Sequence, residues 1–185
     1  MQLPSHGQDR EVSMKLTWAC YFPLLLTAFL FIGVPQDSTF AQIHEESGDV
    51  KDRIAIQEKL LYAYAYAYDS KDCVSWANLF ATDAILNLGP GMKASGRDAI
   101  LKGCIDRQKN VVGSIKTHHN MTNIVFDQLT ARQAKTRTYC VLTWLKPGDT
   151  TPNVQSAFVY RDVIVKQSDG RWLFKERIAV DPPNQ

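Results

Sequence analysis

The sequence has little cysteine, little net charge and almost no long apolar run, and each shortage excludes a class of protein. Four cysteines in 185 residues, none in a C-x-x-C pair, are too few for a disulfide-dense scaffold. A formal charge of +2 without any basic cluster excludes a nucleic-acid binder that relies on dense lysine and arginine. What remains is an ordinary globular composition, 45% hydrophobic and 22% charged, of a length that suits one domain.

The one long apolar run lies near the N-terminus, from Trp18 to Val34, and follows Lys15. Thr39 and Ala41 supply small residues at the −3 and −1 positions of a cleavage site. This order predicts a secretory signal peptide over residues 1–41, with Met14 as an alternative start, and therefore an exported protein, periplasmic or secreted. The alternative is a retained membrane anchor, because about 17 apolar residues approach the length that spans a bilayer. We expect a linker at 42–48, one domain at 49–181 and a tail at 182–185.

Cleavage after Ala41 leaves Cys73, Cys104 and Cys140. An odd number in an exported protein implies at least one free thiol or an intermolecular bridge.

Apolar spacing predicts a long helix over Asp49–Tyr68, followed by a short helix over Asp72–Phe80, a strand over Ala84–Leu88 and a third helix over Gly96–Val112. The run YAYAYAY also suits a strand, but the helical pattern before it favours a helix. Four segments rich in β-branched and aromatic residues predict strands over Ser114–Asp127, Gln133–Trp144, Val154–Lys166 and Arg171–Val180. Helices followed by long antiparallel strands indicate an α+β fold with helices covering one face of a curved sheet.

Several motifs together resemble the SnoaL-like division of the nuclear-transport-factor-2-like superfamily. These are Tyr64, Asp69, Asp72, Phe80, Asp83 and Ala84 along the first helices, GRDAI at Gly96–Ile100, THHNMTN at Thr117–Asn123, and the hairpin Phe158–Arg177 with its Asp-Gly-x-Trp turn. The resemblance covers roughly residues 50–180. It implies a cone-shaped α+β barrel, in which a bent antiparallel sheet wraps around the long helix and encloses an apolar pocket.

The chain resembles in particular the scytalone and bile-acid dehydratases and hexachlorocyclohexane dehydrochlorinase, in which a histidine held by an aspartate removes a proton. The resemblance assigns these roles to His119 and Asp69. Imidazole is the side chain whose ordinary pKa suits a base at neutral pH, and a carboxylate on its other nitrogen fixes the tautomer. Strand alternation places Thr117, His119, Met121 and Asn123 on one face and His118 on the other. We therefore expect one of the two histidines in the pocket.

The resemblance adds Tyr64 and Arg177 as electrophilic helpers, the first for a leaving hydroxyl or carbonyl and the second for a departing anion. Core packing and a surface salt bridge are their respective alternatives. Asn123, Cys140, Trp76 and Phe80 are predicted to line the substrate pocket. Cys140 stands on a strand where the dehydratases carry another polar pocket residue, so this part of their mechanism has no counterpart here.

The predicted function is that of a lyase that eliminates water or another small leaving group from an apolar small molecule. Two alternatives are a non-catalytic module that binds a small molecule or packs as a subunit, and an isomerase or cyclase that uses Asp69 as the base. The chemistry requires no cofactor or metal, since His118 and His119 point apart and no Cys or Glu lies at ligand spacing. We expect a homodimer, with no nucleic-acid partner and no membrane contact after cleavage.

Overall fold

The computed structural model describes residues 49–181. The predicted signal peptide (1–41), linker (42–48) and tail (182–185) lie outside the described residues, so they stay predictions. No helix among residues 49–181 is long and apolar enough to cross a membrane.

The first predicted helix is present and runs without a break from residue 49 to Asp69. Its middle is a π-helical segment, η1 (Gln57–Leu61), and its last part is α2 (Tyr62–Asp69). Ile56, Leu60, Tyr64 and Tyr68 recur every four residues and are all buried, which makes this stripe the core-facing side of the helix. Tyr66 on the opposite side is 80% exposed, so the tyrosine run is helical and amphipathic.

The second predicted helix is shorter than expected. Asp72 caps α3 (Cys73–Ala77) by accepting a hydrogen bond from the Ser75 backbone N–H, but the helix ends at Ala77. Phe80 instead begins strand β1 (Phe80–Asn87), and the Phe174 N–H donates to the Leu79 carbonyl at 2.9 Å. Pairing with a strand distant in sequence thus overrides the local helical pattern.

A turn of 3-10 helix, η2 (Gly89–Gly91), and a short strand that was not predicted, β2 (Lys93–Ser95), follow β1. The third predicted helix comprises α4 (Arg97–Arg107) and a terminal π-helical turn, η3 (Gln108–Val112). A disulfide between Cys73 and Cys104 joins α3 to α4, and Cys140 is a free, buried thiol.

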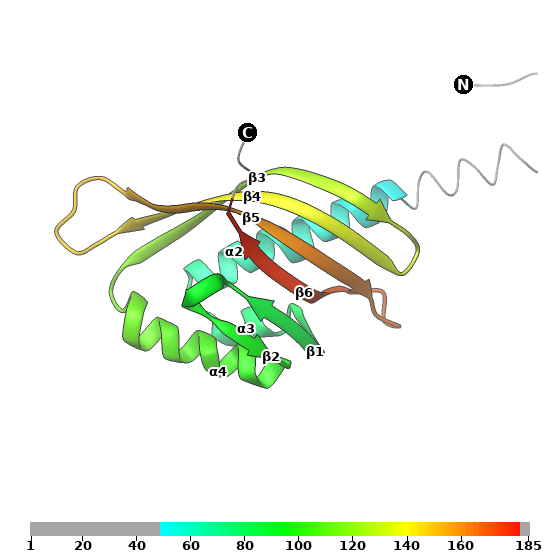
Figure 1. The fold of residues 1–185 in the computed structure, drawn as a ribbon, viewed down its shortest axis with the longest axis horizontal. Helices are drawn as coiled ribbons and strands as arrows, with labels where there is room; N and C mark the ends of the chain where they lie inside the picture. Colours follow the sequence, from blue (N-terminus) through cyan, green and yellow to red (C-terminus); the bar gives the residue numbers. More distant parts are fainter. Residues whose placement is uncertain (1–48, 182–185) are drawn as a thin grey trace, which may run out of the picture. The chain divides into compact units, whose positions relative to one another are not determined.

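Four long strands complete the fold: β3 (Lys116–Leu129), β4 (Gln133–Leu145), β5 (Asn153–Lys166) and β6 (Trp172–Val180). The six strands form one open sheet in the order β2-β1-β6-β5-β4-β3. The predicted antiparallel arrangement holds for every pairing except β1 with β6, which is parallel. Figure 1 shows β3 to β6 curving across the long helix, and the β4–β5 hairpin extending beyond the rest of the sheet.

The core lies between the buried side of the long helix and the inner face of this curved sheet. Aromatic rings fill much of it, including Tyr64, Trp76, Phe80, Tyr160 and Phe174, whose centroids lie 5 to 6 Å apart in tilted or edge-to-face pairs. This packing leaves one end of the sheet's inner face open to a cavity.

Candidate active site

Asp69 is the last residue of α2, and the way the helix ends determines where its carboxylate points. The Lys71 N–H bonds to the Tyr68 carbonyl and the Asp72 N–H to the Ala67 carbonyl, which is the hydrogen-bond pattern of a Schellman motif. Lys71 adopts the left-handed conformation that this motif requires, with φ of 64°. The chain therefore turns sharply after Asp69, and its side chain faces β3.

Three donors from β3 hold the Asp69 carboxylate. Oδ1 accepts from the Thr117 hydroxyl and from His119 Nδ1, each at 2.7 Å, and Oδ2 accepts from the His119 backbone N–H at 2.8 Å. The histidine and aspartate side chains are 6% and 17% exposed. The pair that the resemblance predicted is therefore within hydrogen-bond distance and largely shielded from solvent.

These hydrogen bonds define the histidine tautomer. Since the carboxylate accepts every other bond it makes, Nδ1 of His119 carries the proton that is donated to it. In the neutral imidazole Nε2 is then the unprotonated nitrogen, and its lone pair is available to take a proton from a bound molecule. The ring is also packed edge-to-face against Tyr68, with centroids 5.1 Å apart. This contact and the Asp69 hydrogen bond fix the ring orientation.

Strand alternation predicts the histidine correctly and fails four residues further on, at Asn123. Thr117 is buried, His118 is exposed and His119 is half-buried, as the period of two requires. Pairing with β4 then shifts between Thr122 and Val125, and Asn123 takes a positive φ of 50°. This bulge leaves Asn123 exposed, so the prediction that it lines the pocket is wrong.

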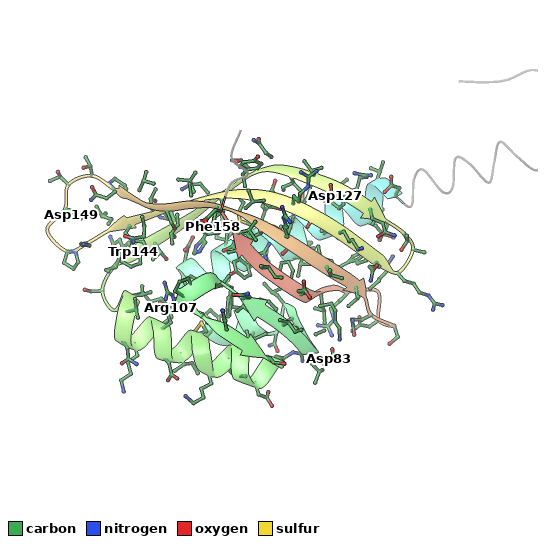
Figure 2. All side chains as sticks on the ribbon, in the orientation of Figure 1. Asp83, Arg107, Asp127, Trp144, Asp149 and Phe158 are labelled. Atoms are coloured by element: carbon green, nitrogen blue, oxygen red, sulfur yellow. A yellow bond between two sulfur atoms is a disulfide. The ribbon has the colours of Figure 1, made fainter. Side chains whose placement is uncertain are left out.

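A cavity of about 290 Å³ lies beside His119. Its wall is mostly apolar, from Leu88 and Val112 on one side to Leu142, Trp144, Phe158 and Ala179 on the sheet. The polar side chains in the wall are Tyr64, Tyr68, Arg107, Thr117, His119, Ser156, Tyr160 and Asp181. Figure 2 labels three lining residues, Arg107 on α4 and Trp144 and Phe158 on the sheet. A cavity of this size accommodates a small organic molecule of one or two rings.

Two tyrosine hydroxyls meet in this wall. The Oη atoms of Tyr64, which the sequence predicted, and Tyr160, which it did not, lie 3.4 Å apart. Burial is the largest influence on both phenols and raises the pKa of each well above its usual value of 10, against a smaller opposing influence from Arg177. Both hydroxyls therefore keep their protons at any physiological pH and can act as hydrogen-bond donors.

Arg177 is placed differently from the prediction. Its side chain is wholly buried, forms two hydrogen bonds of 2.8 and 2.9 Å with Asp162, and is not among the residues that line the cavity. Its guanidinium stacks on the rings of Tyr64, Tyr160 and Phe174 at 4.0 to 4.1 Å from their centroids. Burial is the largest single influence and lowers its pKa, but the charge and hydrogen bonds of Asp162, together with the two phenols, outweigh burial and raise the pKa, so the guanidinium keeps its charge.

This position excludes direct contact between Arg177 and a departing anion in the cavity. Arg177 acts instead on the two tyrosines of the cavity wall. Its positive charge lowers the pKa of both phenols, against the larger effect of burial, which raises them.

The remaining predicted pocket residues belong to the core. Trp76 and Phe80 are wholly buried among the aromatic rings, and Cys140 is 1% exposed on β4. None of the three lines the cavity. Burial raises the pKa of the Cys140 thiol to about 12, so this cysteine is an inert part of the core at neutral pH.

Sequence reasoning missed Thr117, Tyr160, Tyr68 and Arg107. A signal existed for Tyr160, since the period of two along this strand places it on one face with Phe158 and Ile164, two apolar residues. Thr117 was placed on the histidine face without a role. No local pattern distinguishes Arg107 from the other charged residues of α4, because its place depends on how that helix packs.

Among residues 49–181, no three His, Cys, Asp or Glu side chains gather as a metal site would require.

The chain belongs to the SnoaL-like domain family, whose match covers residues 48–178. This confirms the family that the motifs indicated. The chain matches no curated protein.

Solved structures confirm the fold. An NTF2-like protein with a cystatin-like fold from Novosphingobium aromaticivorans has a TM-score of 0.68 at 17% identity, over 81% of this chain and 94% of that one. A candidate scytalone dehydratase from the same species has a TM-score of 0.61 at 24% identity, over 76% and 93%. A protein of unknown function from Mycobacterium tuberculosis has a TM-score of 0.65 at 21% identity, over 78% of each chain. At these identities the likeness shows the fold alone.

Proposed function

We propose that this protein is a cofactor-independent lyase that eliminates water, or another small leaving group, from an apolar small molecule. The observation that carries the proposal is the Asp69–His119 hydrogen bond of 2.7 Å beside an apolar cavity. An oriented imidazole with a free Nε2 is the arrangement expected of a general base. A candidate scytalone dehydratase shares this fold.

The reaction balances with protein side chains alone. Nε2 of His119 takes a proton from the carbon next to a carbonyl, and the electrons of that C–H bond form the new carbon–carbon double bond. The bond to the leaving hydroxyl breaks, and the imidazolium returns its proton to that oxygen as water departs. Asp69 stabilises the imidazolium during this interval. Of the paired hydroxyls of Tyr64 and Tyr160, one donates a hydrogen bond to the carbonyl oxygen as negative charge develops on it, and the other donates to the first hydroxyl.

One alternative fits the site less well. Asp69 is not among the residues that line the cavity, and its two oxygens already accept three hydrogen bonds. A carboxylate so engaged is a poor base for an isomerase or cyclase, which supports histidine as the base. The other alternative, a non-catalytic binding module, is distinguished from a lyase by whether a bound ketone is converted.

The test uses 3-hydroxy-1-tetralone, a bicyclic β-hydroxy ketone whose dehydration yields the fluorescent 1-naphthol. We expect the purified protein to accelerate this reaction and His119→Asn to lower kcat/KM by about 10³-fold, because the base is lost. The matched control is His118→Asn, which changes the neighbouring exposed histidine and should leave the rate unchanged. Binding of the ketone without conversion would support the binding module, and equal rates for the two variants would refute His119 as the base.

A further inference from the structure

Arg107 is a cation in the cavity wall that has no carboxylate partner among residues 49–181. Its Nε donates to the Tyr68 hydroxyl at 3.0 Å and its Nη1 to the Gly91 carbonyl at 3.3 Å, and both of these acceptors are neutral. Four arginines of the described residues bind an aspartate: Arg53, Arg137, Arg171 and Arg177. Arg97, Arg132 and Arg161 form no ion pair within this part of the chain, as Arg107 does not, but of these four only Arg107 lines the cavity. A guanidinium has five N–H donors, so Arg107 retains up to three for a ligand.

Several contacts fix this side chain in place. Gln108, the next residue, donates from Nε2 to the Tyr68 carbonyl at 3.0 Å, so two adjacent residues of α4 and η3 bind the same tyrosine. The disulfide at Cys104, one turn before Arg107, ties α4 to α3. A Cβ added at Gly91 would lie 3.3 Å from Arg107 Nη1, so the glycine leaves the space that the guanidinium occupies.

Arg107 also lies close to the proposed base. The tyrosine that accepts its Nε–H bond is Tyr68, whose ring packs against that of His119 with centroids 5.1 Å apart. Arg107 and His119 thus contact the same tyrosine, and all three residues line the cavity. The one carboxylate in the wall is Asp181, and no ion pair joins it to Arg107 in the described part of the chain.

We propose that Arg107 binds an anionic group of the substrate, which makes the substrate an apolar one- or two-ring molecule that carries a carboxylate. This inference rests on the proposed function, because it assigns the substrate class of the same cavity. The guanidinium would hold the carboxylate through charge-assisted hydrogen bonds from Nη1 and Nη2. The apolar body would lie against the wall formed by Leu142, Trp144 and Phe158, with its reacting carbon toward His119.

The test compares two probes of nearly equal shape, 2-naphthoate and the uncharged 2-naphthamide, by isothermal titration calorimetry at pH 7. We expect the protein to bind the anion about tenfold more tightly than the amide. Arg107→Met keeps the length of the side chain and removes its charge, and it should reduce this preference to within about twofold while amide affinity stays unchanged. The matched control is Arg132→Met, which removes the same charge from an exposed turn and should keep the full preference.

The inference would be overturned if the unchanged protein bound both probes equally or bound neither. It would also be overturned if Arg107→Met still preferred the anion. If Arg107→Met binds neither probe, Arg107→Lys decides, because it keeps the charge. The inference then predicts that the anion is still preferred, and equal affinities would overturn it.

A further variant separates this inference from the proposed function. His119→Asn should retain the preference for naphthoate while it loses elimination activity. If the unchanged protein catalyses elimination but does not prefer naphthoate over naphthamide, only the substrate class is refuted. If the unchanged protein prefers naphthoate but does not catalyse elimination, only the reaction is refuted.

Discussion

This molecule contains two shielded pairs of a carboxylate and a nitrogen-bearing side chain, Asp69–His119 and Asp162–Arg177. They differ in whether the nitrogen-bearing side chain lines the cavity. Asp162–Arg177 is wholly buried, and three aromatic rings surround its guanidinium. Asp69–His119 is bonded as closely, but His119 lines the cavity and its Nε2 has no role in the pair. The first arrangement stabilises the core, and the second suits proton transfer.

The contrast shows why a pairing pattern alone does not identify a catalytic group. The family resemblance marked Asp69, His119 and Arg177 as functional, yet of these three only His119 lines the cavity. If the two pairs have these separate roles, changes to Asp162–Arg177 should affect mainly stability and changes to Asp69–His119 mainly activity.

Arg177→Met should lower the free energy of unfolding by about 3 to 5 kcal/mol, because it leaves the Asp162 carboxylate buried without its counter-charge. Urea denaturation followed by circular dichroism measures this change. In the double variant Asp162→Leu, Arg177→Met, both charges are absent, and most of the lost stability should return. A single variant as stable as the unchanged protein would contradict the structural role of this pair.

Loss of the disulfide should destabilise the protein by about 2 to 4 kcal/mol, as expected for a cross-link that closes a loop of some 30 residues. Cys73→Ser, Cys104→Ser removes it without touching either pair, and thermal unfolding under non-reducing conditions measures the effect. The Asp69–His119 hydrogen bonds involve only α2 and β3, so elimination activity below the unfolding temperature should survive. Loss of activity in a folded variant would show that the disulfide itself positions the base.

Stability should fall at alkaline pH because of the groups packed around Arg177. Burial raises the pKa of Cys140 to about 12 in the folded protein, and it raises the pKa of Tyr64 and Tyr160 above 10. From about pH 9 for the thiol and pH 10 for the phenols, the unfolded chain loses protons that the folded chain keeps. Each group then costs about 1.4 kcal/mol of stability per pH unit until its folded pKa is reached.

The measurement is the free energy of unfolding at pH 8 to 11 for the unchanged protein and for Cys140→Ala. The variant should show a shallower decline between pH 9 and 10, where only the thiol contributes. Identical slopes in this interval would mean that Cys140 titrates in the folded protein as it does in the unfolded chain.

Much of this organisation could be predicted from the sequence, because the long helix and the four long strands have periodic apolar patterns over nine residues or more. The Asp69–His119 pair could be predicted because the family motif and strand alternation agree as far as Met121. The bulge at Asn123, the end of α3 at Ala77 and the short strand β2 depend on pairing between distant segments. The same holds for Arg177 and Arg107, whose places in the core and the cavity wall depend on how β6 and α4 pack.

The most direct test of the separate roles of Asp69 and Asp162 applies one isosteric change to each carboxylate. The value of kcat/KM for dehydration of 3-hydroxy-1-tetralone is then measured under conditions where both variants are folded. We expect Asp69→Asn to lower kcat/KM by about 100-fold or more, with a loss of stability below about 2 kcal/mol. Asp162→Asn should lose more stability and keep activity within about tenfold, since its carboxylate acts only through Arg177 and the tyrosines. An Asp69→Asn variant as active as the unchanged protein would show that Asp69 does not support His119 as the base.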